Sequence, residues 1–193
     1  MQTLNDTNFC RYEVKKSIFI TYAAPVNEFD ALRMKLKTEH PKAAHVVWAY
    51  RKLNEFNQIV ENGSDDGEPK GTSAQPILNV LRGAEFINVC VLVVRYFGGV
   101  KLGTGGLVRA YSTAAKSVLN EAKVTVYEQK ENFIFACKYG SVSRIEHFLE
   151  KIEAAFGERE FGAESVTWKL KLCAKQKKEF KIFLDALGET NYH

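Results

Sequence analysis

The chain has 193 residues, of which 46% are hydrophobic and 26% are charged, as is typical of an ordinary globular protein with one large domain or two modest ones. Its formal net charge of +4 permits an anionic partner but is too small to indicate a nucleic-acid-binding protein by itself. The sequence lacks an apolar run long enough for a membrane span, an apolar signal segment at its start, and CxxC spacing among its four cysteines. We therefore expect a reduced, cytoplasmic protein without a membrane partner.

The first part of the chain alternates between strand-like and helix-like patterns. Residues 12–24 are rich in β-branched and aromatic side chains and predict one strand. Residues 28–39 predict a helix that is capped by Asn27 and buries one apolar face, formed by Phe29, Leu32 and Leu36. Two further strands are expected over residues 43–52 and 56–62.

A polar loop and a glycine-rich loop separate the elements that follow. After the loop "NGSDDGEPKGTS", Thr72 or Ser73 can cap a short helix that ends at Gly83. The valine-rich run "INVCVLVVRYF" lacks alternation and predicts a strand covered on both faces. A cluster of glycines then leads into a helix expected over about residues 106–121.

Residues from 129 onward predict a second, smaller domain. A strand over residues 132–139 is expected to place three side chains on one face, those of Phe133, Phe135 and Cys137. The spacing of Ser143 and Glu146 predicts a capped helix start, two strands follow within residues 159–174, and an apolar stripe predicts a last helix. This βαββα order, with only "ETNYH" left for a fourth strand, predicts a ferredoxin-like domain. The fold class is then α+β with two domains, residues 1–128 and 129–193.

The glycine-rich loop is the first candidate site. Five of the thirteen glycines fall within "GGVKLGTGG", between a strand and a helix start. Such a turn can bind an anion, because free backbone N–H groups and the helix dipole point at the ligand, and nearby cations add charge-assisted hydrogen bonds. The alternative is that the glycines only supply positive φ angles and close packing. The spacing matches neither common nucleotide-binding motif. The candidate ligand-binding residues are Arg95, Gly98, Gly99, Lys101, Gly103, Gly105, Gly106 and Arg109.

The acidic loop "SDDGEPKGTS" is the second candidate site. Asp65, Asp66 and Glu68 offer oxygen ligands for Mg²⁺, the one cofactor that this interpretation allows, or a general base. His45 precedes a strand and can face the same site as an assisting base. The alternatives are a solvated acidic turn and a histidine held by structural hydrogen bonds. No catalytic residue or metal ligand is settled by the sequence.

Four segments, "AAHVVWAYR", "SDDGEPKGT", "LVVRYFGG" and "KLGTGGLVRAY", resemble the IMPACT family in its bacterial YigZ type, and the match extends over nearly the whole chain. The resemblance implies an N-terminal βββαβα domain, as in GHMP-type kinases and a small-subunit ribosomal protein, followed by a ferredoxin-like domain. The pair is similar to domains IV and V of elongation factor G. Eukaryotic relatives are linked to translational control, whereas the resemblance carries no secure catalytic activity.

One position departs from the pattern of the family. The usual motif continues Gly-Thr-Ala-Gly, whereas this chain has Gly71-Thr72-Ser73-Ala74. A positive φ or a close ligand approach at Ala74 is disfavoured, but an alanine inside a helix is stabilising.

Three functions remain open on the sequence. The first, which we favour, is a non-catalytic, translation-linked protein that binds RNA, the ribosome, a nucleotide or another phosphate-bearing ligand at the glycine-rich loop. The second is a Mg²⁺-dependent phosphoryl-transfer or hydrolytic enzyme that uses the "DDGEP" loop. The third is an adaptor for a protein partner that the sequence does not name.

Overall fold

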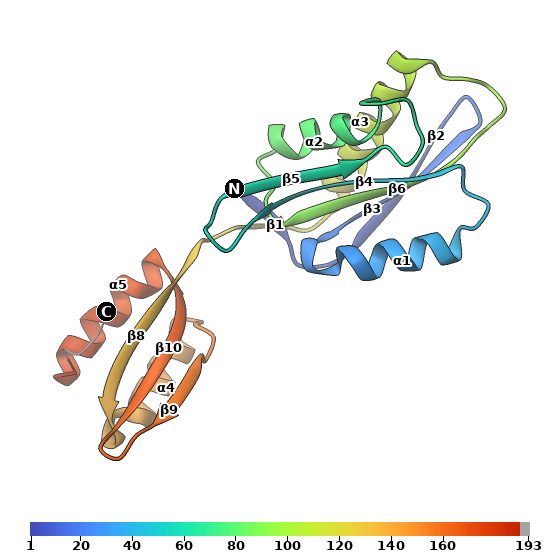
Figure 1. The fold of residues 1–193 in the computed structure, drawn as a ribbon. Helices are drawn as coiled ribbons and strands as arrows, with labels where there is room; N and C mark the ends of the chain where they lie inside the picture. The colour runs from blue at the N-terminus through green and yellow to red at the C-terminus, as the bar shows by residue number, and fades with distance from the viewer. Residues whose placement is uncertain (190–193) are drawn as a thin grey trace. The chain divides into compact units, whose positions relative to one another are not determined.

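The computed structural model describes residues 1–189, and the chain divides into two compact units, Met1–Tyr127 and Glu128–His193 (Figure 1). We call them unit 1 and unit 2. Each contains helices and sheets, so that the fold class is α+β as predicted. No helix within residues 1–189 is long and apolar enough to cross a membrane.

Unit 1 is built on a five-stranded antiparallel sheet. Its strands lie in the order β2 (Asn8–Val14), β3 (Ser17–Pro25), β6 (Val89–Tyr96), β4 (His45–Leu53) and β5 (Ile59–Ser64). Figure 1 shows that one helix covers one face and two helices cover the other. These helices are α1 (Phe29–Glu39), α2 (Ala74–Gly83) and α3 (Thr104–Glu121). A separate two-stranded ladder joins β1 (Gln2–Leu4) to β7 (Val124–Val126).

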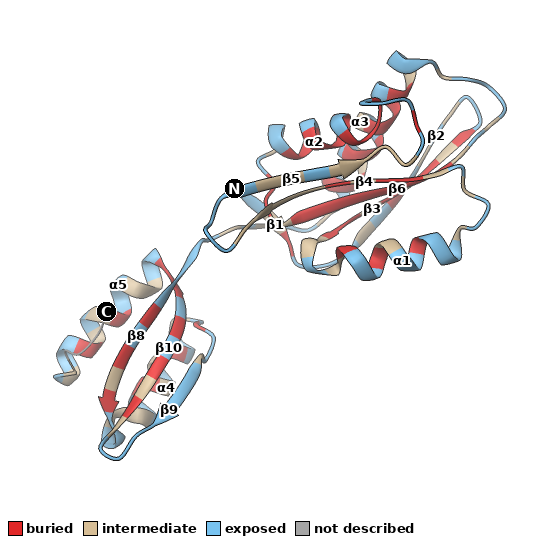
Figure 2. Cartoon of the chain, viewed as in Figure 1, coloured by how far each residue is buried: buried red, intermediate tan, exposed pale blue. Residues whose placement is uncertain are grey.

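The central strand β6 explains why unit 1 has two cores. Its residues alternate between the two faces of the sheet: Val89, Val91 and Val93 pack under α2 and α3, whereas Cys90, Leu92 and Val94 pack against α1. All of these side chains are buried (Figure 2). The valine-rich run predicted a strand covered on both faces, and this prediction is confirmed.

The segment 12–24 is not one strand, as predicted, but parts of two strands joined by a tight turn. Val14 pairs with Ser17, so that the turn has only two central residues, Lys15 and Lys16. Both are left-handed, with φ of 48° and 63°. A two-residue hairpin turn of type I′ requires positive φ at both central residues and usually obtains it from Asn-Gly or Gly-Gly. Lysine carries no such signal, and for this reason the sequence pattern missed the turn.

Two predicted helix caps are wrong. A short 3₁₀ turn, Val26–Glu28, leads directly into α1, so that Asn27 lies inside that turn and the helix begins at Phe29. Another 3₁₀ turn, Tyr139–Ser141, leads into α4 (Val142–Lys151) and leaves Ser143 inside that helix. In both cases the chain enters the helix from an existing turn, without a side-chain cap.

Unit 2 is a three-stranded antiparallel sheet with two helices on one face. The strands lie in the order β8 (Lys130–Lys138), β10 (Ser165–Cys173) and β9 (Glu158–Phe161), and the helices are α4 (Val142–Lys151) and α5 (Ala174–Leu187). The predicted apolar faces are buried together, including Phe133, Phe135, Trp168, Phe180 and Leu184. The expected fourth strand falls mainly on residues 190–193, outside the described part of the chain. The ferredoxin-like description therefore stays a prediction.

All four cysteines are buried as free thiols. They lie in both units, at positions 10, 90, 137 and 173. Burial raises the pKa of the Cys90 thiol to about 12.

Candidate functional site

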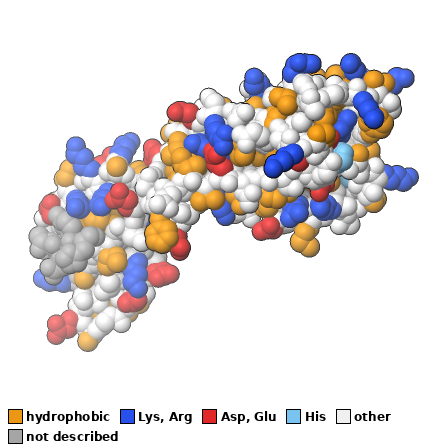
Figure 3. Space-filling view, turned by 45° about the horizontal axis from the view of Figure 1, so that its top comes forward, with side chains coloured by type: hydrophobic (Ala, Val, Ile, Leu, Met, Phe, Trp, Pro, Cys, Tyr) orange, Lys and Arg blue, Asp and Glu red, His pale blue; other side chains and the backbone are white. Residues whose placement is uncertain are grey.

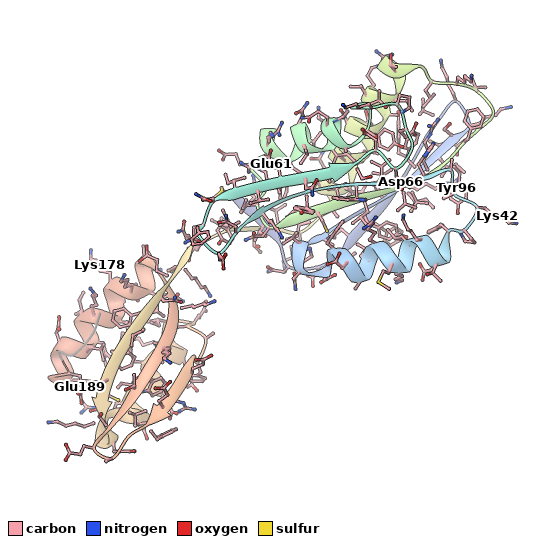
Figure 4. The ribbon with its side chains drawn as sticks, viewed as in Figure 1. Lys42, Glu61, Asp66, Tyr96, Lys178 and Glu189 are labelled. Atoms are coloured by element: carbon pink, nitrogen blue, oxygen red, sulfur yellow. The ribbon has the colours of Figure 1, made fainter. Side chains whose placement is uncertain are left out.

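The segments that carry the resemblance meet at one end of the unit 1 sheet. His45, the first residue of β4, pairs with Arg95 near the end of β6, and β5 ends beside β4 at Ser64. The loop 65–73 follows β5, and the glycine-rich loop follows β6. Figure 4 shows the labelled Asp66 and Tyr96 at this end of the sheet.

Glu68 is the centre of a buried polar cluster. Arg95 Nη1 donates a hydrogen bond to Glu68 Oε1 at 2.5 Å, and the Tyr111 hydroxyl donates to the same oxygen at 2.7 Å. His45 Nε2 lies 3.9 Å from Glu68 Oε2. The Glu68 and Arg95 side chains are only 3% and 6% exposed. We call His45, Glu68, Arg95 and Tyr111 the Glu68 cluster.

The Glu68 cluster brings together groups that would be costly to bury alone. A buried carboxylate needs a compensating cation, which Arg95 supplies. Burial raises the pKa of the Tyr111 phenol well above its ordinary value, and the neighbouring Glu68 charge raises it further, so that the hydroxyl stays a donor. These contacts connect β4, β6, α3 and the acidic loop to one another. Its first role is structural.

His45 is held by the acidic loop in a single tautomer. Its Nδ1 lies 2.8 Å from the Asp66 carbonyl oxygen, which only accepts hydrogen bonds, so that Nδ1 carries the proton. Gly67 has a φ of 90°, and a Cβ there would lie 3.4 Å from Nδ1. The glycine therefore lets the loop lie against the imidazole ring.

Asp65 caps the start of α2. Its Oδ1 accepts hydrogen bonds from the Ser73 amide, the Ser73 hydroxyl and the Ala74 amide, and its Oδ2 accepts one from the Gly71 amide. Burial tends to raise the pKa of Asp65, but these hydrogen bonds outweigh it, so that the pKa lies below its ordinary value. Ser73 is the N-cap residue in position only, since its hydroxyl donates to Asp65. Ala74 is the first residue of α2, so its departure from the usual glycine fits a helix.

Asp66 is also engaged with the protein. Its Oδ2 accepts a hydrogen bond from the Val46 amide at 2.7 Å, and its Oδ1 lies 3.6 Å from Lys37 Nζ. Within residues 1–189, no group of three or more His, Cys, Asp or Glu side chains is placed to hold a metal ion. The structure therefore does not bring Asp65, Asp66 and Glu68 together as the expected Mg²⁺ ligand set, because each carboxylate faces a different protein partner.

The glycines of the glycine-rich loop, the first candidate site, have different roles. A Cβ on Gly98 would lie 2.0 Å from the Lys16 carbonyl carbon, so this glycine allows the loop to touch the β2–β3 turn. Gly99 and Gly103 have positive φ angles of 83° and 73°, which a glycine adopts without strain. Gly105 and Gly106 lie inside α3, because the helix begins two residues before the predicted start.

The backbone N–H groups of residues 99–106 have no hydrogen-bond acceptor in the described part of the chain. The preceding amide, that of Gly98, donates to Ser17 Oγ at 3.2 Å, and the first intrahelical bond of α3 is donated by Leu107. α3 also lacks a side-chain cap. Its first turn therefore presents free donors and the positive end of the helix dipole at an exposed loop.

Lysine and arginine side chains surround this helix start. Lys101 and Arg109 are exposed, and Arg109 Nη1 would lie 3.8 Å from a Cβ at Gly105, near the first turn of α3. Lys15 and Lys16 join them across the contact with Gly98. Figure 3 shows more Lys and Arg than Asp and Glu side chains at the right-hand end of unit 1. We call Lys15, Lys16, Lys101 and Arg109 the cationic tip.

Two differences from the predicted site follow. Arg95 was expected to neutralise a ligand, but it is buried and paired with Glu68. Lys15 and Lys16 were not expected at the site at all. The only signal that could have placed them there is the hairpin, which the sequence pattern does not show.

The protein is therefore a two-unit α+β protein. The sequence motifs of unit 1 meet at one end of its sheet. The sequence profile of the Impact N-terminal domain matches residues 15–119. An IMPACT family member of Haemophilus influenzae is 36% identical over 154 residues, which cover 78% of this chain and 75% of the relative. IMPACT family member YigZ of Escherichia coli is 35% identical over 142 residues, or 71% and 69% of the two chains.

A solved structure agrees with these relatives. It is described as the crystal structure of an hypothetical protein, is 29% identical, and covers 100% of this chain and 94% of its own, with a TM-score of 0.75. The chain belongs to the IMPACT family, and its similarity to YigZ supports the predicted bacterial type.

Proposed function

We propose that this protein is a translation-linked regulatory protein that binds the phosphate groups of RNA, or of another phosphate-bearing ligand, at the glycine-rich loop. The link to translation rests on family membership and on what the resemblance implies for eukaryotic relatives. The observation that carries the binding proposal is the row of free N–H groups over residues 99–106. Because these donors lie at the start of an 18-residue helix, they favour an anion.

The cationic tip supports a phosphate as that anion. Lys101 and Arg109 carry full charges beside the helix start, and charge-assisted hydrogen bonds to phosphate are stronger than neutral ones. Neither side chain is in an ion pair with a residue from the described range 1–189. Their charges are therefore available to a ligand.

The enzymatic alternative has less support from the geometry. A Mg²⁺-dependent phosphoryl-transfer or hydrolytic site needs free carboxylates, whereas Asp65 caps α2, Asp66 binds a backbone amide and Glu68 is paired with Arg95. A panel of nucleotides and phosphate esters incubated with the protein and Mg²⁺ tests it. Turnover that is lost in Asp66→Asn would favour the enzyme over the binding protein.

The binding proposal is tested by RNA affinity measured over a range of salt concentrations. We expect binding to weaken with salt, because RNA phosphates exchange their counterions for protein cations. Lys101→Ala is expected to reduce the slope of log affinity against log salt by about 0.7, the value for one phosphate contact on a single strand. The matched control is Lys178→Ala, an exposed lysine of α5.

Two results would contradict the proposal. One is the absence of any salt-dependent interaction with RNA or inorganic polyphosphate in the unmodified protein. The other is an equal loss in Lys101→Ala and Lys178→Ala, which would indicate general charge attraction rather than a site at the loop.

A further inference from the structure

We infer that the phosphate-bearing ligand is single-stranded RNA and that Phe97 stacks against one of its bases beside the cationic tip. The inference rests on the proposed function for the phosphate contact, but it adds a different group, an exposed aromatic ring, and a preference for unpaired bases. Four observations carry it: the exposure of the ring, its fixed position, the surrounding charge and the conformation of the β2–β3 turn.

Phe97 is an exposed ring next to buried ones. It follows β6 directly and is 52% exposed, whereas Phe19 beneath the same strand end is fully buried. The Arg95 guanidinium carbon lies 5.9 Å from the Phe97 ring centroid and 5.5 Å from that of Phe19. Phe97 has no aromatic partner within residues 1–189, so that the ring keeps a face for an added stack.

The position of the ring is fixed by its neighbours in the chain. The preceding residue, Tyr96, is tied to the other side of the sheet by a hydrogen bond between its hydroxyl and His40 Nδ1, at 2.8 Å. The following residue, Gly98, touches the backbone at Lys16 so closely that no Cβ fits. Phe97 is therefore held between the β2–β3 turn and the glycine-rich loop, and so beside the cationic tip.

The charge around Phe97 is complementary to a nucleic acid. The four cations of the tip are exposed and form no ion pair with the described residues. By contrast, two other arginines of unit 1, Arg51 and Arg82, both pair with Glu61. An acidic protein could also meet these charges, but an open aromatic ring beside cations and free amides is the combination that binds unpaired bases and their phosphates together.

The backbone conformation of the β2–β3 turn indicates that the charges of its two lysines have a role. Lys15 and Lys16 both adopt the left-handed conformation, which residues other than Gly, Asn and Asp reach at a cost. Asn-Gly would form the same turn with less strain. The turn itself does not need the positive charges of the two lysines. Their position beside Phe97 allows these charges to contact a phosphate.

The experiment measures the affinity of the full chain for three probes by fluorescence anisotropy. Each probe either carries a fluorescent label or competes with a labelled probe. The probes are an oligouridylate of about ten nucleotides, an RNA duplex of the same length, and inorganic polyphosphate, which has charge without bases. We expect the single strand to bind more tightly than the duplex. Phe97→Ala is expected to weaken binding of the single strand by about tenfold, the loss of one base stack, and to leave polyphosphate binding unchanged.

Three variants complete the design. Phe56→Ala removes another ring, which is 73% exposed and lies in the β4–β5 turn, and is expected to bind like the unmodified protein. Phe97→Trp keeps a stacking surface and is expected to retain the affinity. Lys15→Asn/Lys16→Gly is expected to raise thermal stability while weakening the binding of all three probes, because it relieves strain and removes two charges.

The inference is overturned if the duplex binds as tightly as the single strand, or if Phe97→Ala and Phe56→Ala behave alike. Polyphosphate binding that depends on Lys101 would then leave the proposed phosphate site standing. If neither RNA nor polyphosphate binds the unmodified protein, the proposed function falls together with the inference.

Discussion

Glu68 joins three separate segments of unit 1 through one carboxylate. Its loop follows β5, Arg95 is the penultimate residue of β6, and Tyr111 lies in the second turn of α3. Within residues 1–189, Glu68 is the only ion-pair partner of the buried Arg95 guanidinium. Stability at this end of the sheet therefore depends on a single charge pair.

Glu68→Ala is expected to lower the free energy of unfolding by about 3–5 kcal/mol, because Arg95 would keep its charge without a buried partner. Urea denaturation followed by circular dichroism measures this. Glu55→Ala, at an exposed position in the β4–β5 turn, is the control and is expected to change little. The double variant Glu68→Met/Arg95→Met is expected to recover part of the loss, since both charges are gone. Equal stability of the two single variants would contradict the structural role.

The sequence predicted the residues of this site better than their partners. His45, Asp65, Asp66, Glu68 and Arg95 were selected because carboxylates, histidine and arginine are the groups that bind metals and phosphates. A sequence shows which groups are present but not which of them face one another. Asp65 accepts four hydrogen bonds at the start of a helix whose cap was assigned to Thr72 or Ser73 instead.

At the scale of the elements, the contact between the glycine-rich loop and the β2–β3 turn positions the whole tip. Gly98 lies against backbone atoms of Lys16 and Ser17, which have no rotamer to change. A side chain at Gly98 would have to displace either the loop or the hairpin.

Gly98→Ala is expected to destabilise unit 1 by about 1–3 kcal/mol, because a methyl group would overlap the Lys16 backbone. Thermal denaturation of the full chain measures the change. The matched control is Gly83→Ala at the end of α2, where a Cβ has open space and helix propensity favours alanine by up to about 1 kcal/mol. A Gly98 variant as stable as the Gly83 variant would show that the loop does not depend on this contact.

Elements with a long, regular pattern were predicted well. β6 has a continuous apolar run, and β10 alternates buried apolar residues with lysines, so that each pattern has one plausible placement. The ladder of β1 and β7 was missed, because each strand has three residues and its partner lies more than a hundred residues away. The β2–β3 turn was missed for a local reason, since two lysines occupy positions that glycine or asparagine usually holds.

At the scale of the whole molecule, the division into two units follows from separate cores. The apolar clusters of unit 1 and of unit 2 share no residue, and every residue of the Glu68 cluster and the cationic tip belongs to unit 1. Family membership was predictable because the motifs are long and occur in order. The ligand was not, because a loop that binds phosphate and a loop that only packs use the same glycines.

Because all four cysteines are buried, the folded chain is expected to be unreactive toward thiol reagents. Ellman's reagent is expected to react slowly with the folded protein and to report four thiols only after unfolding in guanidinium chloride, because Cys90 and the others are shielded from solvent. Rapid labelling of the folded chain would contradict this. A cysteine introduced at Lys101 would then be the one readily labelled position, so that a dye on the glycine-rich loop could follow ligand arrival without removing any native thiol.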